Sequence, residues 1–495
     1  MNGCYDVTVI GGGVVGCAIA RELARYKMKI GVLEKEPDVG FGTSSRNSAV
    51  LHSGIAYPPG TLRAVLAVKG NAMMDELCAQ LKVKIKRIGK LTVALTEENL
   101  PGLYKYKEQG EANGVQGMEL LDNEKMRRIQ PGVEGILGLW TPSSAIISAF
   151  GLTIALAENA LANGVDFHLN CEVQTIKRVM DRFEVGCANG KSFQTRLLIN
   201  SAGLHCDEVS IMAGFPEAKI WPCRGEYYVL DKRLDGALKT LVYPVPGMND
   251  PTWGIHLTPT VDGNILIGPS VTYIPDEDRE DYRTTSSVME DLRKQGLRLL
   301  PDLVLSDFIR NFAGNRSRQN PPDKGRADFT IEETSVPGFI HLLGIESPGL
   351  TSAPSIAEMV RDLVAKRIPL EKKNDFIAER PGFVGTFSEL PLEQRADLVA
   401  SDPEYGEIIC RCEKITKKEI RQAIENPLKA RTMSSIKYRA RALMGRCQGG
   451  FCTPRIVRML RDEYGYKSED FLLRGGAPMF SGYARGPLQK GGEAR

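Results

Sequence analysis

The sequence predicts a mixed α/β protein (α+β overall) with two interleaved domains and a small helical domain near the C-terminus. Three observations support this prediction. A glycine-rich turn joins a short apolar strand to a helix at the start of the chain, strand-like and helical segments then alternate in separated blocks, and four cysteines fall between residues 410 and 452. A chain of 495 residues has room for about three domains of about 150 residues each.

The first element is a βαβ unit. Residues 6–10, "DVTVI", form an apolar strand, "VVGCAIARELARY" has helical apolar spacing, and "KIGVLEKE" predicts a second strand. Gly11, Gly13 and Gly16 lie between strand and helix in the G-x-G-x-x-G register, which permits a tight turn, close approach of a pyrophosphate and close helix packing. Glu34, at the end of the second strand, is placed to accept hydrogen bonds from an adenosine ribose. The unit therefore predicts dinucleotide binding.

The elements that follow predict two domains that interleave along the chain. An Ala-rich helix and the strands "VDFHLNCEVQTIKRV" and "TRLLINSAG" resume the first domain, and a second, strand-rich block runs from "RGEYYVL" to "NILIGPS". The predicted boundaries are 1–87, 146–215 and 320–368 for the first domain and 88–145 and 216–319 for the second. A linker at 369–406, a cysteine-bearing domain at 407–466 and a glycine-rich tail at 467–495 complete the plan.

Composition and charge narrow the choice of partners and compartment. The net charge of +3 comes from 64 basic against 61 acidic side chains, which argues against nucleic acid. No apolar run approaches the ~20 residues that cross a bilayer, so any membrane contact is expected to be peripheral or through a partner. The first residues run directly into a strand, which leaves no room for a secretory leader. We therefore expect a cytoplasmic protein, in which eleven cysteines do not form a disulfide framework.

The loops after the βαβ unit favour FAD over NAD. Only one dinucleotide fingerprint occurs, and "GFGTSSRNSAVLHSGI" is a hydroxyl-rich loop suited to run under a pyrophosphate toward an isoalloxazine ring. "SAGLHCDEVS" offers a second strand-to-glycine turn, and "ESPGLT" precedes a helix whose N-terminus would stabilise an anionic reduced flavin. The predicted cofactor residues are Gly11, Gly13, Gly16, Glu34, Thr43, Ser44, Ser45, Asn47, Ser48, Val173, Ala202, Gly203, Asp207, Gly314, Gly349, Leu350 and Thr351.

These motifs in series resemble the D-amino-acid-oxidase-type FAD oxidoreductases, in the branch of the L-2-hydroxyglutarate and glycerol-3-phosphate dehydrogenases. The resemblance covers roughly residues 4–365 and rests on "DVTVIGGGVVGCAIARELARY", "GTSSRNSAVLHSGI", "RGEYYVL", "GIHLTPTVDGNILIGPS" and "GIESPGLTSAPSIAE". It implies an FAD-binding domain of glutathione-reductase type and a substrate domain whose antiparallel sheet roofs the flavin.

The four clustered cysteines predict a metal centre. Cys410 and Cys412 form a C-x-C, and Cys447 and Cys452 form a C-x4-C after a 34-residue gap. Four thiolates from two loops hold either a [2Fe–2S] cluster or a tetrahedral zinc ion. The pattern resembles the [2Fe–2S] domain of bacterioferritin-associated ferredoxin type, and is similar to a segment in the large subunit of anaerobic glycerol-3-phosphate dehydrogenase. A flavin that takes up a hydride needs a one-electron exit, which a cluster supplies and zinc does not.

The substrate side is expected to combine a base with anion-binding arginines. Histidine is suited to accept a hydroxyl proton because its unperturbed pKa of ~6.5 lies near neutral pH. Alternatively, a histidine there positions or covalently binds the flavin. Arginine forks suit a carboxylate or a phosphate. The predicted catalytic and substrate residues are His52, His256, Arg224, Arg316 and Arg318.

The sequence therefore predicts an FAD and [2Fe–2S] dehydrogenase that oxidises a small anionic secondary alcohol, either glycerol 3-phosphate or an L-2-hydroxy acid such as L-2-hydroxyglutarate. An amine dehydrogenase of the same fold is one alternative. An electron-transfer subunit of a larger complex is another. The electron acceptor is expected to be another flavoprotein or iron–sulfur subunit, a ferredoxin or a quinone.

Overall fold

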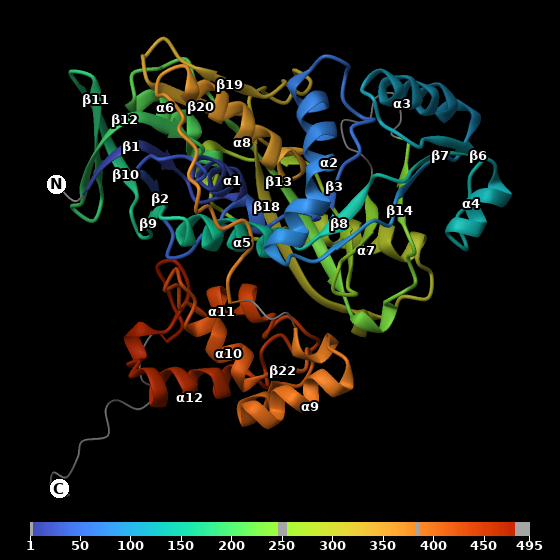
Figure 1. Cartoon of the computed structure of the whole chain (residues 1–495). Coiled ribbons are helices and arrows are strands. Elements are labelled where there is room, and N and C mark those ends of the chain that lie inside the picture. The colour runs from blue at the N-terminus through green and yellow to red at the C-terminus, as the bar shows by residue number, and fades with distance from the viewer. Residues whose placement is uncertain (1–2, 246–254, 383–385, 481–495) are drawn as a thin grey trace, which may run out of the picture. The chain divides into compact units, whose positions relative to one another are not determined.

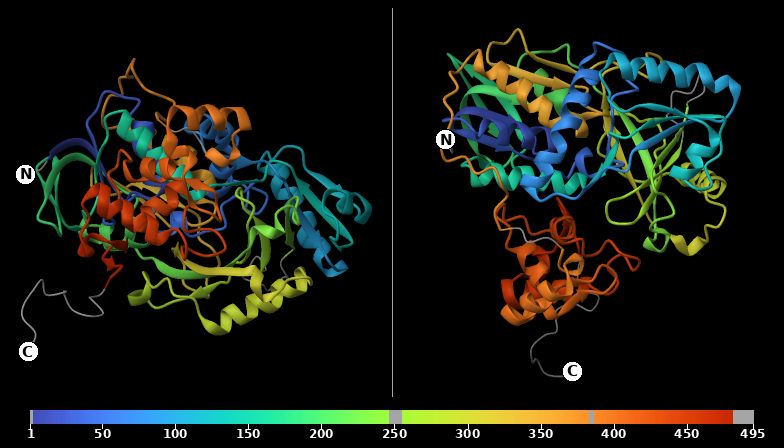
Figure 2. Two further views of the ribbon diagram at one scale, coloured as in Figure 1. Left: turned by 90° about the horizontal axis from the view of Figure 1, so that it is seen from below. Right: turned by 45° about the vertical axis from the view of Figure 1, so that its right-hand side comes forward.

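The computed structural model describes residues 3–245, 255–382 and 386–480. The chain forms two compact units, Met1–Phe383 and Val384–Arg495. The first unit contains two large sheets, which Figure 1 shows at left and right and Figure 2 shows from two further sides. No helix in the described part of the chain is long and apolar enough to span a membrane.

The first sheet is mixed, with a parallel centre. β1 (Gly3–Ile10) pairs in parallel with β2 (Ile30–Leu33) on one side and with β12 (Ser192–Asn200) on the other. Val7 and Val9 of β1 are fully buried, as expected for a strand covered on both faces. The remaining strands are β9 (Asp166–His168), β10 (Val173–Val179), β11 (Arg182–Cys187), β19 (Thr330–Glu333) and β20 (Phe339–Leu343).

Four helices pack together beside this sheet. α1 (Val14–Leu23) contacts α5 (Ala149–Ala162) and α8 (Gly349–Ala365), and α8 also contacts α2 (Leu62–Leu81). The short α6 (Cys206–Met212) contacts β10, β12 and β20. Because β1, α1 and β2 follow one another, the glycine turn lies at the carboxyl end of the parallel strands, where α/β proteins bind nucleotides.

The second sheet has nine strands and is antiparallel except at one place. β5 (Lys90–Ala94) and β14 (Leu241–Pro244) run in parallel, because they come from separate chain segments that meet in the middle of the sheet. The other members are β6 (Glu119–Leu121), β7 (Leu137–Thr141), β13 (Trp221–Leu230), β15 (His256–Pro259), β16 (Ile265–Gly268), β17 (Thr272–Tyr273) and β18 (Phe308–Arg318). Its helices are α3 (Leu100–Ala112), α4 (Asn123–Ile129) and α7 (Ser286–Leu299).

The expected interleaving of the two domains is confirmed. The chain leaves the first sheet after β2, forms β5 to β7, returns for β9 to β12, and leaves again for β13 to β18 before closing with β19 and β20. A small sheet of β3 (Val50–Leu51), β4 (Ile85–Lys86) and β8 (Ala145–Ile147) lies where the chain crosses between them.

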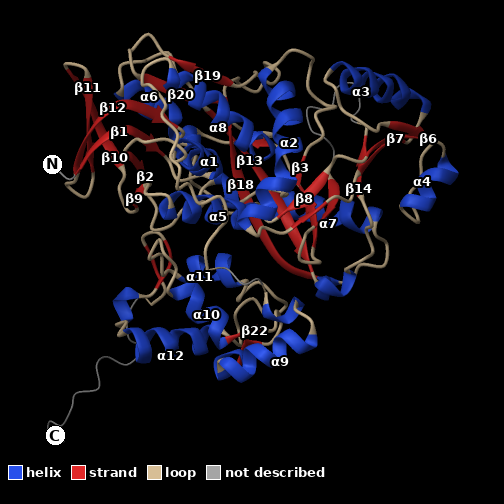
Figure 3. Ribbon diagram, in the orientation of Figure 1, coloured by secondary structure: helices blue, strands red, loops and turns tan. Residues whose placement is uncertain are grey.

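The second unit is mainly helical, as Figure 3 shows by colour. Its helices are α9 (Leu392–Ser401), α10 (Lys417–Ile424), α11 (Met433–Ala440) and α12 (Thr453–Tyr464), and two short hairpins are formed by β21 (Ile408–Cys410) with β22 (Ile415–Thr416) and β23 (Leu472–Arg474) with β24 (Ala477–Pro478). Thr416 caps α10 through a capping box with Glu419. Ile420, Ile436 and Ile456, one from each of three helices, form a buried core.

Two segments differ from the sequence expectation. Residues 392–406, expected within a linker, form α9 and a 3-10 turn, and that turn contacts both α9 and α10. Residues 472–478, expected within the glycine-rich tail, form a hairpin after the buried Phe471. Phe471 adds apolar surface to a core that is otherwise small, which favours an ordered hairpin. The end of the tail, 481–495, lies outside the described residues.

Candidate functional site

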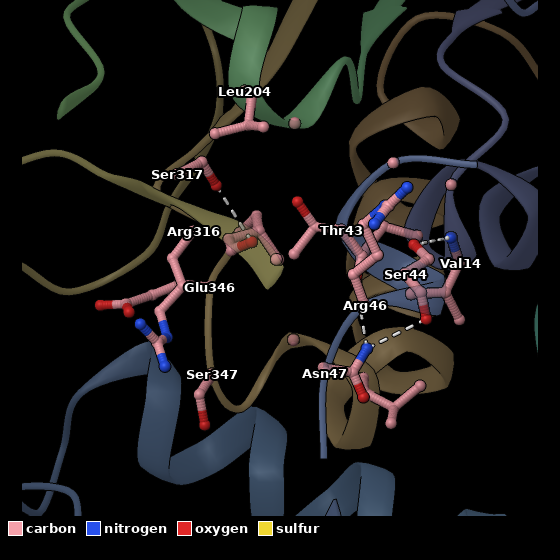
Figure 4. A pocket seen from close by; sticks show the side chains of 18 of the residues that line it. Val14, Thr43, Ser44, Arg46, Asn47, Leu204, Arg316, Ser317, Glu346 and Ser347 are labelled. Carbon is pink, nitrogen blue, oxygen red and sulfur yellow. Dashed lines mark hydrogen bonds between the residues drawn. The ribbon is translucent and has the colours of Figure 1, made fainter. Parts of the chain in front are cut away.

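A cavity in the first unit is lined by both sheets. One side is formed by the glycine turn, the loop 40–48 and the turn 201–205, and the opposite side by strands of the second sheet. In Figure 4, Val14 and Ser44 lie at one side of this cavity, and Arg316, Glu346 and Ser347 at the other. The cavity therefore extends from the nucleotide turn to the region where the predicted histidines lie.

The glycine turn presents the N-terminus of α1 to the cavity. Gly11 and Gly13 line it, and Gly11 has φ +101°, in the left-handed region that favours glycine. Gly16 does not line the cavity, because it packs against the strand, where an added Cβ would collide with the carbonyl oxygen of Gly11. The backbone N–H of Val14 donates to Ser44 Oγ at 2.9 Å, so the loop 40–48 is tied to the start of the helix.

Glu34 is held at the edge of the cavity by backbone amides. Its carboxylate accepts from Gly12 N at 2.6 Å and from Glu36 N at 2.9 Å. Burial nevertheless raises the pKa of Glu34 to about 7, which the two backbone hydrogen bonds only partly oppose. A ligand with hydroxyl donors would stabilise the ionised carboxylate. This position suits an adenosine ribose.

The hydroxyl-rich loop contributes four of its five predicted residues to the cavity lining, namely Thr43, Ser44, Asn47 and Ser48. Ser45 does not line it. Asn47 Nδ2 donates to the carbonyl oxygens of Thr43 and Ser44, which fixes the loop as a compact turn. Gly314 of β18 also lines the cavity, and an added Cβ there would collide with the carbonyl of Arg46, so glycine lets the sheet approach this loop.

The second glycine turn is divided between cavity and core. Ala202 and Gly203 line the cavity, whereas Asp207 is buried behind it, where it accepts from Ile220 N at 3.0 Å and pairs with Arg279. Val173 lies on β10 and packs against the core of the first sheet. Asp207 in α6 and Val173 in β10 thus lie outside the cavity lining.

The N-terminus of α8 completes the cofactor side. Gly349 and Leu350 line the cavity, and Thr351 lies behind them, where its Oγ1 accepts from the backbone N–H of His52 at 3.0 Å. Thr351 therefore orients the backbone that carries His52. The first backbone N–H groups of this helix supply positive potential at one end of the cavity.

His52 and His256 both line the far end of the cavity. The ring of His256, on β15, lies with its centroid 3.8 Å from that of Tyr243, and His52 Nε2 lies 3.3 Å from Ser347 Oγ. Burial, with smaller effects of Lys90, His256 and Arg326, lowers the pKa of His52 to about 3. His52 is therefore neutral near pH 7, as a proton acceptor must be.

The three predicted arginines are placed differently. Arg316 lines the cavity, with its guanidinium 3.4 Å from the carbonyl of Ser270. Arg224 does not, since it pairs with Asp281 at 2.9 Å. Arg318 does not either, because it lies between Glu346 and the hydroxyl of Tyr273.

Sequence reasoning missed three cations and an acid at this end. Arg326 and Glu346 line the cavity, and Arg63 donates to Glu346 at 3.0 Å. Burial alone would raise the pKa of Glu346, but the guanidiniums around it, Arg326 foremost, hold it at about 2. Arg326 lies in "DKGRADF", close in sequence to the predicted substrate residues Arg316 and Arg318, and no local sequence pattern distinguishes it from them.

Lys90 is the third missed cation. It is 3% exposed, its Nζ lies 5.3 Å from the centroid of Tyr243, and burial lowers its pKa to about 8. In the described part of the chain no carboxylate pairs with it. The lysine in the short apolar strand "KLTVA" could have indicated this site from the sequence. A charged side chain is rarely buried, because its burial costs free energy unless the charge is paired or binds a ligand.

The four cysteines of the second unit lie as two pairs. Cys410 and Cys452 are buried and hydrogen-bonded to each other, and Cys412 and Cys447 are exposed and also hydrogen-bonded to each other. The hydrogen bond from Cys452, with smaller ones from backbone amides, lowers the pKa of Cys410 to about 6. The backbone N–H of Phe451 donates to Cys447 and lowers its pKa. One cysteine of each pair, Cys410 and Cys447, is thus favoured as the thiolate, the form that binds metal, while the pKa of its partner thiol, Cys452 or Cys412, is raised.

This arrangement fits a binuclear cluster. Two cysteine pairs offer two ligands to each of two irons. Gly445 brings the second ligand loop close to the first, because a Cβ there would collide with Cys412.

Comparison with known proteins bears out both predicted cofactors. The chain belongs to the FAD dependent oxidoreductase family, which it matches over residues 6–363, and residues 408–462 match the BFD-like [2Fe-2S] binding domain. It is accordingly a flavoprotein oxidoreductase whose cofactors are FAD and a [2Fe–2S] cluster, and the resemblance seen in the sequence is confirmed.

Relatives define the branch more closely. The chain is 41% identical to a glycerol 3-phosphate dehydrogenase of Caloramator mitchellensis over 467 residues, 93% of this chain and 95% of the relative. It is 30% identical to the mitochondrial L-2-hydroxyglutarate dehydrogenase of Bos taurus over 417 residues, 74% of this chain and 90% of the relative. Among solved structures it resembles the L-alpha-glycerophosphate oxidase of Mycoplasma pneumoniae, with TM-score 0.71 and 29% identity, covering 77% of this chain and 100% of that one.

Proposed function

We propose that this protein oxidises a small anionic secondary alcohol, with glycerol 3-phosphate as the first candidate and an L-2-hydroxy acid such as L-2-hydroxyglutarate as the second. FAD, when bound, supplies the hydride acceptor. The observation that carries the proposal is the concentration of guanidinium groups at the end of the cavity where the histidines lie. Arg63, Arg316, Arg318 and Arg326 surround one carboxylate, that of Glu346.

Such a cluster favours an anionic ligand. Arg63 and Arg318 are buried and pair with Glu346, so this carboxylate already offsets part of their charge. Arg316 and Arg326 both line the cavity, so a phosphate or carboxylate bound there would accept charge-assisted hydrogen bonds from their guanidiniums. Lys90 adds a further buried cation near Tyr243.

The neutral imidazole of His52 is the proposed proton acceptor, and His256 the second candidate. Both line the same end of the cavity as Arg316. A substrate anion held by Arg316 and Arg326 would bring its hydroxyl toward the histidines, and the hydroxyl proton would pass to the imidazole as the hydride leaves the same carbon. Ser347 Oγ lies 3.3 Å from His52 Nε2 and 3.5 Å from the hydroxyl of Tyr57, which would orient the imidazole.

Glycerol 3-phosphate is ranked first because the glycerol 3-phosphate dehydrogenase relative spans 93% of this chain, whereas the L-2-hydroxyglutarate dehydrogenase spans 74%. The arginines suit either anion. Electrons are proposed to leave through the [2Fe–2S] site of the second unit to a one-electron acceptor.

The test is an anaerobic titration followed by flavin absorbance, with glycerol 3-phosphate, L-2-hydroxyglutarate and uncharged glycerol added separately. One of the two anions should bleach the flavin and glycerol should not. Arg316→Ala should raise the concentration of anion needed for half-maximal reduction by roughly 10- to 100-fold, as expected for a lost charge-assisted hydrogen bond of about 1.5–3 kcal/mol.

Arg224→Ala is the matched control, since Arg224 lies on the neighbouring strand but is paired with Asp281 outside the cavity lining. It should leave that concentration unchanged. If neither anion reduces the flavin while dithionite does, the substrate class is wrong. If glycerol works as well as its phosphate, the arginine argument is wrong.

A further inference from the structure

The cluster-binding region, residues 407–466, is strongly basic, whereas the rest of the chain is slightly acidic. Residues 407–466 hold 14 of the 64 basic and 6 of the 61 acidic side chains, a net charge of +8, which leaves −5 for the other residues. Several of these cations are neutralised locally: Lys417 and Arg421 pair with Glu404 and Glu463, and Arg441 pairs with Glu413. The cations left over are therefore the informative ones.

Two of these cations lie beside the cluster ligands. The guanidiniums of Arg411 and Arg455 lie 4.3 and 4.5 Å from the ring centroid of Phe451. Phe451 directly precedes the ligand Cys452, and its backbone N–H donates to the ligand Cys447. In the part of the chain that the structure describes, neither arginine forms an ion pair; Arg455 donates to the carbonyl of Ile408 instead. We call these three residues the Arg–Phe–Arg stack.

The two cysteine pairs differ in exposure. Cys410 and Cys452 are buried at 2% and 0% exposure, whereas Cys412 and Cys447 are exposed. An iron held by Cys412 and Cys447 would therefore lie at the surface, and one held by the other pair inside. Arg411 adjoins Cys412 in the chain and is itself exposed, and Phe451 is partly exposed.

We propose that the exposed Cys412/Cys447 side of the cluster site, with the Arg–Phe–Arg stack at its edge, is the docking surface for an acidic one-electron carrier protein. The proposal rests on the proposed role of the cluster as the electron exit. One electron passes from this protein to the carrier, so the protein is oxidised and the carrier is reduced by one electron. No bond forms or breaks, and no proton is transferred. Arginine and aromatic side chains are the residues that dominate protein interfaces, and unpaired cations attract an acidic partner from a distance.

Charge complementarity identifies the partner as acidic. A basic carrier would meet like charges, which repel it at close range and slow its encounter with this surface. The alternative is that the arginines only stabilise the negative charge of the cluster itself. The two roles predict different effects of reversing an arginine's charge. If the arginines only stabilise the cluster, the reversal changes the rate of electron transfer to every acceptor in the same direction. If they dock the partner, it slows transfer to an acidic acceptor and speeds transfer to a basic one.

The test uses the complete protein, reduced with dithionite so that no substrate is needed, and two haem proteins of opposite surface charge, acidic cytochrome b5 and basic cytochrome c. Stopped-flow absorbance follows oxidation of the cluster at increasing salt. The rate with cytochrome b5 should fall as salt rises, and the rate with cytochrome c should not. At low salt Arg411→Glu and Arg455→Glu should each slow cytochrome b5 by about tenfold and speed cytochrome c.

Lys467→Glu is the matched control, with the same change of charge. Lys467 is exposed and follows the C-terminal end of α12, whereas Cys452 directly precedes the first residue of this helix, which is about 18 Å long at 1.5 Å per residue. It should leave both salt slopes unchanged. If a reversal at Arg455 disturbs cluster absorbance, Arg411→Glu alone decides the outcome.

Three results would overturn the proposal: a cytochrome b5 rate that is independent of salt, variants that change both rates in the same direction, or a control variant with an equal effect. The second result would establish the alternative role in cluster stabilisation. Because dithionite supplies the electrons, none of these results depends on the substrate, so failure of the docking surface and failure of the proposed function are distinguishable.

Discussion

Affinity for FAD should depend on pH through Glu34. Burial raises the pKa of this carboxyl to about 7 in the FAD-free cavity. Ribose hydroxyls donate to the ionised form, so binding would return the pKa toward its ordinary value near ~4.5. Below pH 7 the free protein carries a proton that FAD binding must release, and the affinity therefore falls as the pH falls.

The size of the effect follows from the shift. Each unit of pKa change is worth about 1.4 kcal/mol, or a tenfold change in affinity. If FAD binding lowers the pKa of Glu34 by roughly two units, the dissociation constant of FAD should be about 100-fold larger at pH 5 than at pH 8. Above pH 7 the carboxylate is ionised in both states, and affinity should be flat. Glu34→Gln cannot ionise and should lose this slope, while binding about 10- to 100-fold more weakly at pH 8 because a charge-assisted hydrogen bond becomes a neutral one.

The assay is reconstitution of the FAD-free protein, followed by quenching of flavin fluorescence between pH 5 and pH 8. The glutamine variant is the necessary comparison, because His205 and Glu280 also line the cavity and have shifted pKa values of their own. A slope that is equally steep in Glu34→Gln would assign the effect to those groups. An affinity that is flat in the native protein would refute the reasoning from burial.

Two further predictions concern the cofactor sites. Gly16→Ala should lower the flavin content of the purified protein, measured by the ratio of flavin to protein absorbance, because the new Cβ collides with the carbonyl of Gly11; Gly325→Ala, whose Cβ meets nothing within 4 Å, is the control and should retain FAD. Cys447→Ser should leave flavin reduction by substrate intact while it stops one-electron transfer outward, measured with a one-electron dye. Unchanged turnover with that dye would show that electrons leave by another route.

Much of the fold and of the cofactor sites could be predicted from local sequence. The βαβ unit is specified by an apolar strand, three glycines and an acid within about thirty residues, because turn geometry and phosphate approach are local requirements. The C-x-C and C-x4-C motifs indicated a cluster for the same reason, since short loops hold their ligands wherever the rest of the chain goes. Both cofactor predictions, FAD and [2Fe–2S], are confirmed by the family matches.

Only the tertiary structure decided which arginines face the cavity. Arg316 pairs across the sheet with Cys223, so the side chain of Arg224, one residue further on, lies on the opposite face, where Asp281 holds it. Strand register sets this choice, and a shift of one residue would reverse it. Arg318 shares a face with Arg316, but its contact is Glu346, which comes from a distant part of the chain.

The same distinction applies to the charges that sequence reasoning missed and to the cysteine pairs. The position of Lys90 near the cavity residue Tyr243 is set only when β14 pairs with β5. The pairing of Cys410 with Cys452 depends on the packing of α12 in the second unit. The sequence by itself determined which cofactors this protein binds, because turns and ligand loops are local. The tertiary structure decided which side chains meet at the cavity, because charges from separate segments interact only after the two sheets have formed.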